Sequence, residues 1–313
     1  KNISQINLYI APSQQPYKVE NAQYNYSAHN CEYYLNLFIS KWERQNKEFD
    51  ETNQTVIVNM KNTTLIFEGC TSLTLEQLDI MVKNSSIEMN QKPSLFINNS
   101  NFILSNPLGS DFITVTDGEK IKLNNISVTM ESIATFLKSS ISYFGFSECL
   151  SLQDILVRYS LLQPEPRSPE DLALFDFTGG SGYEIAGVRN ISFEVRFRNN
   201  KNSYTLLYLE TIFAFENFQN ISVTNVSMKN QSLSLFNKNW IRFKTIDSVQ
   251  LDTLIIQNNT FSILKSSPLL SFEGITKLEI TNAHLLSSKF RNSSSAFSLA
   301  FFSEVSEIRM FDQ

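Results

Sequence analysis

The chain has 313 residues, with 26 basic and 31 acidic side chains and a formal net charge of −5. A mild negative charge with scattered basic residues gives no electrostatic footprint for nucleic acid, so we do not expect a nucleic-acid partner. No uninterrupted apolar run approaches the roughly 18 residues of a membrane-spanning helix, so we expect no transmembrane segment in this chain.

Residues 1–55 are the least regular part of the sequence. Ile3, Ile6 and Leu8 have the spacing of two short strands, whereas the charged segment 40–52 shows no strand alternation. We predict that residues 1–55 form an irregular first coil, with the charged segment as a helical or loop insertion on its flank. We expect this coil to be continuous with the repeat that follows, and the repeat to continue beyond both ends of the chain.

From residue 56 to residue 313 the sequence repeats one apolar pattern: an alternating pair, about five residues, a second pair, two residues and a third pair. The first complete copy has the pairs Leu65 and Phe67, Leu73 and Leu75, and Leu78 and Ile80. Copies recur at intervals of about 22 to 36 residues, which is typical of a solenoid.

Three short strands per copy, each with two inward side chains, predict an all-β fold, a right-handed parallel β-helix of about 9–11 coils. Each coil is one copy of the repeat, and its inward side chains stack on those of the next coil. We expect one inward column to contain Phe67, Phe144, Phe215, Phe243, Phe272 and Phe302.

The two residues between the second and third pairs predict a tight corner with one residue in the left-handed conformation. Asn and Asp tolerate that conformation better than other residues with side chains. They occupy the second corner position in most copies, at Asn99, Asn125, Asp154, Asn190, Asn225 and Asn282. We predict a ladder of side-chain amides there, turned inward. A leucine-rich-repeat solenoid is the alternative fold, but its Asn would stand one residue later, where this chain has apolar residues such as Ile126 and Val226.

The strand and corner pattern of residues 56–313 resembles the pectin-lyase-like family of parallel β-helix proteins. It also resembles the large Asn- and Phe-rich β-helix surface proteins of ciliated protists. The hydrolase branch of the family is marked by clustered aspartates, a Gly-His-Gly and an Arg-Ile-Lys, and the chain has none of these. Neither of its two histidines, His29 and His284, adjoins a glycine. The resemblance therefore implies a fold and leaves the function to other residues.

A lyase of this family would need carboxylates for calcium and a basic residue on the outward face of the first strand. The outward residues expected on that face are Asp176, Glu216, Arg242, Lys244 and Glu273. Their alternating signs are typical of charge pairing on a solvated sheet, and they define the alternative, a polysaccharide face. No metal-ligand spacing, phosphate loop or nucleophile motif occurs, so we expect no catalytic residue, metal or cofactor.

The sequence has thirteen Asn-x-Ser/Thr sequons, about twice the number expected by chance. The glycosylation candidates are Asn84, Asn230, Asn258 and Asn292, which follow third strands, together with Asn53 and Asn62. Sequons at Asn125, Asn190 and Asn225 leave a choice between glycan and ladder. An Asn- and Ser-rich composition is the alternative explanation of the excess. Cys31 and Cys70 could pair, or all three cysteines could be unpaired.

The sequence thus predicts an extracellular or cell-surface location. We expect a glycosylated structural β-solenoid, a subunit of a coat, rod or filament that associates end to end, and not an enzyme. The alternative is a β-helix protein that binds or cleaves polysaccharide. An enzyme of this kind would use the charged face named above.

Overall fold

The computed structural model describes residues 5–7, 17–20, 23–35, 56–76, 78–107, 109–132, 134–142, 147–159, 173–180, 184–195, 211–229, 232–233, 240–257, 260–262, 268–286, 289–291 and 300–311. Every regular element within these residues is a strand. Within the same residues, no helix has the length and hydropathy needed to cross a membrane.

The strands are β1 (Gln5–Asn7), β2 (Tyr17–Glu20), β3 (Gln23–Leu35), β4 (Val56–Lys61), β5 (Thr64–Glu76), β6 (Leu78–Lys83), β7 (Ser86–Asn90), β8 (Ser94–Ser105), β9 (Asp111–Gly118), β10 (Lys120–Met130), β11 (Thr135–Ile141), β12 (Leu150–Tyr159), β13 (Ala173–Gly179), β14 (Ile185–Val195), β15 (Thr211–Lys229), β16 (Ser232–Leu233), β17 (Ile241–Gln257), β18 (Thr260–Ser262), β19 (Leu270–Leu286), β20 (Lys289–Arg291), β21 (Ala300–Ser303) and β22 (Glu307–Phe311).

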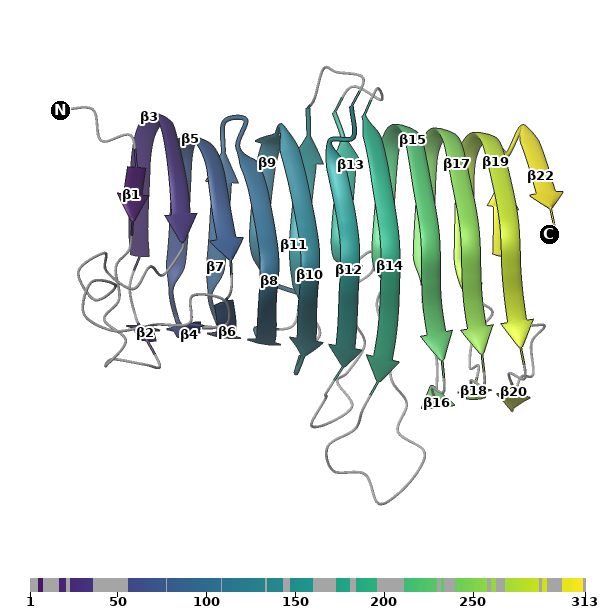
Figure 1. Ribbon diagram of the computed structural model, residues 1–313, viewed down its shortest axis with the longest axis horizontal. Coiled ribbons are helices and arrows are strands. Elements are labelled where there is room, and N and C mark those ends of the chain that lie inside the picture. Colours follow the sequence, from purple (N-terminus) through teal and green to yellow (C-terminus); the bar gives the residue numbers. More distant parts are fainter. Residues whose placement is uncertain are drawn as a thin grey trace, which may run out of the picture.

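The strands pair in parallel, and each pairs with the strand one repeat later in the chain. The three apolar pairs of the repeat give each coil a first, a second and a third strand position. The first position is occupied in successive coils by β7, β9, β11, β13, β15, β17, β19 and β21. The second and third positions are occupied together by β8, β10, β12 and β14. Figure 1 shows the coils side by side in chain order, from β1 at one end to β22 at the other. The all-β, parallel, solenoid-like architecture predicted from the repeat is confirmed.

The register reproduces the inward columns read from the sequence. One column, at paired positions in successive coils, contains Leu73, Leu95, Ile121, Leu150, Ala186, Ile221, Val249, Leu278 and Ile308. The first eight of these side chains are buried. A parallel stack of identical coils requires this constant register, because the period of two along each strand keeps one face on the core.

The phenylalanine column is correct except at Phe144. Paired positions hold Phe67, Met89, Val115, Ser139, Phe177, Phe215, Phe243, Phe272 and Phe302. The prediction for Phe144 is wrong because Ser139 occupies that place in the column, and Phe144 itself lies outside the described residues. The six-residue spacing from Phe144 to Leu150 imitates the other copies, although β11 has already ended at Ile141.

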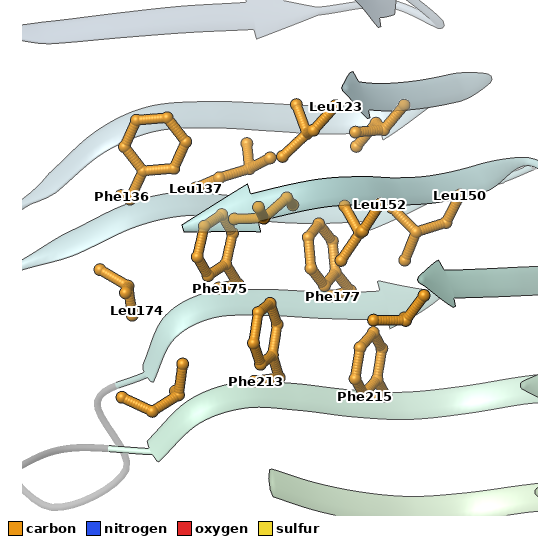
Figure 2. Packing of buried hydrophobic residues seen from close by; sticks show 14 of the residues in the cluster. Leu123, Phe136, Leu137, Leu150, Leu152, Leu174, Phe175, Phe177, Phe213 and Phe215 are labelled. Carbon is orange, nitrogen blue, oxygen red and sulfur yellow. The ribbon is translucent and has the colours of Figure 1, made fainter. Parts of the chain in front are cut away.

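Aromatic rings in this part of the core stack across coils. The Phe215 and Phe243 ring centroids are 5.7 Å apart, and those of Phe243 and Phe272 are 5.2 Å apart at an interplanar angle of 6°. Figure 2 shows Phe177 on Phe215 in the same column, and Phe175 on Phe213 in the column two residues earlier along the strand. Such pairs add about 0.5–1.5 kcal/mol each beyond the burial of their area.

Two further buried columns were not predicted. One lies at the start of the first-strand position, inside β9, β11, β13 and β15 and just before β17 and β19, and contains Phe112, Phe136, Leu174, Ile212, Trp240 and Leu269. The other lies between the first and second positions, inside β15, β17 and β19, and contains Phe218, Ile246 and Ile275. In both columns the buried side chain departs from the strict alternation of the strand. Paired apolar neighbours such as Phe136 and Leu137 are the sequence signal for the first column.

The first coil joins the same stack. β1 pairs with β3, β3 with β5, and β2 with β4, all in parallel. This agrees with one continuous solenoid. The charged segment 40–52 lies outside the described residues.

Candidate functional site

The outward face of the first strands carries the charged residues singled out from the sequence. We call this the first-strand face. One row contains Thr114, Lys138, Asp176, Ala214, Arg242 and Ser271 at paired positions. The next row contains Thr178, Glu216, Lys244, Glu273 and Ser303. The structure therefore brings all five predicted residues together and adds Lys138, which the sequence reasoning missed.

The charges in the second row neutralise one another. The Lys244 ammonium donates a hydrogen bond to Glu216 at 2.8 Å, and this bond raises the pKa of Lys244 above its ordinary value. Both side chains are more than one third exposed, so the pair contributes at most about 1 kcal/mol to stability. Its arrangement is the cross-strand pairing of opposite charges expected on a solvated sheet.

Asp176 is a half-buried carboxylate of the first-strand face, and burial shifts its pKa. Burial raises its pKa above the ordinary value of 3.8, while the nearby charges of Arg242 and Lys138 lower it. The neighbouring position in the row is Ala214, whose small side chain is buried. Lys138 also lies 3.9 Å from Asp111. Asp176 is therefore held between two cations by through-space attraction.

The first-strand face has a limited chemical repertoire. Within the described residues, no group of three or more His, Cys, Asp or Glu side chains is placed to hold a metal ion. Asp176, whose pKa is raised by burial, has the property that a general acid needs. Its neighbour Glu216, however, already accepts a hydrogen bond from Lys244. The geometry favours a surface that pairs its own charges.

The corner positions have the predicted backbone and an unpredicted orientation. The backbone angle φ lies between 49° and 55° at all six predicted corner residues, Asn99, Asn125, Asp154, Asn190, Asn225 and Asn282. The amides of Asn125 and Asn225 donate to Asn99 and Asn190 at 2.8 Å, and Asn190 donates to Asp154 at 2.8 Å. The predicted ladder is therefore present, but its side chains are exposed or half-exposed and do not turn inward. Each corner residue lies between the inward positions of the second and third pairs, as Asn125 does between the buried Leu123 and Ile126, and its own side chain points away from the core.

The ladder is interrupted where an amide is missing. Asp154 accepts from Asn190 and from Gln153, but a carboxylate has no N–H to give to Asn125. At the next interruption Thr253 stands at the corner with φ 56°. There Asp252 takes the place of Thr253 as the acceptor for Asn282, at 3.0 Å, while no bond to Asn225 is present among the described residues.

Two sequon asparagines form a second ladder that the sequence reasoning missed. Asn62 and Asn84 both have φ 49°, and the Asn84 amide donates to Asn62 at 2.9 Å. Both side chains are exposed. The predicted acceptors Asn53, Asn230, Asn258 and Asn292 lie outside the described residues. The signal for this ladder was the 22-residue repeat of Asn before a small polar residue.

The corner sequons lie at the surface, and their amide nitrogens are also the donors of the ladder. The side chains of Asn125, Asn190 and Asn225 all face outward. Asn220, at a further sequon, is also exposed. The outward geometry leaves each of these asparagines accessible at the surface.

Two described side chains, Cys149 and His284, add no reactive site. Cys149 is fully buried, and burial raises the pKa of its thiol to about 11. Such a thiol is unreactive at neutral pH. His284 is exposed on β19, as expected for a solvated residue. Cys31 and Cys70 occupy paired register positions on β3 and β5.

Comparison with known proteins returns nothing that assigns a family. No family model, curated protein or solved structure matches the chain.

Proposed function

We propose that this chain is an extracellular, glycosylated structural protein, a right-handed parallel β-helix that forms part of a surface coat, rod or filament. The observation that carries the proposal is the buried core that extends through the described coils. Inward columns run through the described coils, and hydrogen-bonded amides follow the corners. A long stack of this kind resists bending and shear, which suits a rod.

The charged face supports a structural reading over a catalytic one. Glu216 and Lys244 are joined directly, and Glu273 occupies the next paired position. A catalytic pair would need unshared carboxylates around a substrate. We therefore propose that the protein is not an enzyme and uses no cofactor.

Glycosylation is the second part of the proposal. Sequon asparagines at Asn62, Asn84, Asn125, Asn190, Asn220 and Asn225 are exposed, so the fold has room for N-linked sugars at these places. Glycans on the corners would separate neighbouring rods. The presence of N-linked glycans would also indicate that the protein is secreted or lies on the cell surface.

End-to-end association is the third part. In β21 and β22 the side chains that continue the inward columns are exposed, by 38% at Phe302, 43% at Ile308 and 63% at Met310. Their equivalents one coil earlier, Phe272 and Leu278, are fully buried. We propose that a parallel coil of a second copy covers this face by strand addition.

Electron microscopy of the native protein, with peptide mapping after enzymatic deglycosylation, tests all three parts. The proposal predicts rods with sugar at exposed sequons. Compact monomers without sugar would contradict it. Rods in which further residues of the same polypeptide cover Phe302 would contradict only the third part.

Polysaccharide binding is a second candidate function, favoured by the half-buried Asp176 between Lys138 and Arg242. An array of acidic and neutral polysaccharides would test it. Binding that is lost in Arg242→Ala, and kept in the ladder variant Asn225→Ala, would favour this candidate over a purely structural role.

A further inference from the structure

At one junction between neighbouring coils, three irregularities of the stack coincide. It lies between the coil of β9 and β10 and the coil of β11 and β12. We call it the 130/135 junction, after the residues that flank it. A polar residue in the core, a shift in register and a missing bond in the corner ladder occur together there.

The first feature is a polar residue in the phenylalanine column. Ser139 stands between Val115 and Phe177 in the register and is 4% exposed. Its hydroxyl has no hydrogen-bond partner in the described structure. At every other described position of this column the residue is apolar. A buried hydroxyl without a partner destabilises the packed state relative to an opened one.

The second feature is a shift in the backbone register. Ser139 pairs with Val115, but Ile141 pairs with Gly118, so β9 has one extra residue against β11. Asp117 is left-handed at φ 56°, as Asn217 and Thr245 are at the same place in their coils, so β11 is the strand that is one residue shorter. The Asp117 N–H donates to the Ser140 hydroxyl at 2.9 Å instead of to a main-chain carbonyl. The ladder of main-chain bonds is locally broken there.

The third feature is the missing rung in the corner ladder. Asn125 donates away from the junction, to Asn99, and Asp154 accepts from the far side, from Asn190. Asp154 cannot supply the N–H that would join it to Asn125. In the described structure the corner at Thr253 likewise has no bond to Asn225, because Asp252 accepts on the other side, from Asn282. The Phe215–Phe243 stack beside that corner, however, is intact.

Other contacts keep the junction closed in the folded state. The Phe112 and Phe136 ring centroids are 6.0 Å apart, and Asp111 lies 3.9 Å from Lys138. The junction is therefore packed, but two of its strand positions carry defects that are absent from its neighbours. In a solenoid, stability is the sum of coil terms and nearest-neighbour interface terms, so one weak interface divides the stack.

We propose that the 130/135 junction is a built-in joint that divides the solenoid into two cooperative units, residues 56–130 and residues 135–311. Under denaturant or tension the stack separates there before either unit loses its own structure. The joint is a property of the fold and does not depend on the proposed function.

Hydrogen exchange of the full chain in increasing urea, read by mass spectrometry, tests the joint. Peptides within each unit should share one exchange midpoint, and the midpoint should step between residues 130 and 135. Asp154→Asn supplies the missing N–H, and Ser139→Val removes the hydroxyl. The double variant should slow exchange in the less stable unit by about tenfold or more and remove the step.

Thr253→Asn is the matched control, because it changes the ladder at an interface whose ring stack is intact. It should leave the step between residues 130 and 135 in place. Asp154→Asn alone lies on the surface, so it keeps the test valid if the double variant misfolds, and it should reduce the step. A wild-type profile with no step, a step elsewhere, or a step that Asp154→Asn leaves unchanged would each overturn the joint.

Discussion

The ring stack through Phe243 allows a quantitative prediction. Phe243 is fully buried and contacts Phe215 on one side and Phe272 on the other, at centroid distances of 5.7 and 5.2 Å. Phe243→Leu keeps most of the apolar volume but removes both stacked pairs. At about 0.5–1.5 kcal/mol per pair, we expect a loss of about 1–3 kcal/mol in the free energy of unfolding.

Phe302→Leu is the matched control for Phe243→Leu. Phe302 stacks on Phe272 alone, at 5.3 Å, and is partly exposed. Its loss should therefore be about half as large. Urea unfolding followed by circular dichroism measures both variants, and equal slopes of the transitions would validate the comparison. Equal losses at the two positions, or a loss at Phe243 below about 0.5 kcal/mol, would refute the reasoning from stacked rings.

Four further predictions follow from single side chains. Asn282→Ala should lower the free energy of unfolding by about 1–3 kcal/mol, because it removes the hydrogen bond to Asp252 and strains a left-handed residue. Asn282→Gly should lower it less, because glycine adopts that backbone without strain. Equal losses of the two variants in urea melts would exclude the strain. Asp176→Asn should raise the melting temperature at pH 7. Burial raises the pKa of Asp176 in the folded state, so the wild-type protein loses stability as the pH rises from 3.8 towards that folded-state pKa. The gain should vanish below pH 3.8, and a gain independent of pH would contradict the assignment. Cys149 should resist alkylation at pH 8 until the chain unfolds, because the pKa of its thiol is about 11, and rapid labelling of folded protein would show that the thiol is accessible. Cys31 and Cys70 stand at paired positions in adjacent strands, so non-reducing peptide maps of secreted protein should show them linked; free thiols at both would contradict this.

The sequence alone predicted the register of the stack. The period of two within each short strand and the repeat of the three pairs place Leu73, Ile121 and Val249 in one column. The left-handed corners were predictable too, because Asn and Asp tolerate that backbone. Even the two rows of the first-strand face followed, since outward residues of neighbouring coils must be adjacent.

Other features depended on geometry that no spacing reports. Ser139 was overlooked because Phe144 lies six residues before Leu150, the spacing of the other copies. The outward direction of the ladder depends on how a two-residue corner turns between inward neighbours. The half-burial of Asp176 depends on surrounding side chains from several coils. These are properties of the packed stack, not of one repeat.

The central claim is that successive copies of the repeat stack in parallel at a constant spacing. Lys122, Gln250 and Arg309 are exposed and occupy one row, with four coil steps from Lys122 to Gln250 and six from Lys122 to Arg309. Spin labels at cysteines introduced there, with Cys31 and Cys70 replaced by Ser, report these spans by pulsed electron resonance. At about 4.8 Å per step, backbone separations of about 19 and 29 Å are predicted, and the two label distances should differ by about 10 Å. Equal distances for the two pairs, or a shorter one for the pair that includes Arg309, would contradict the stack.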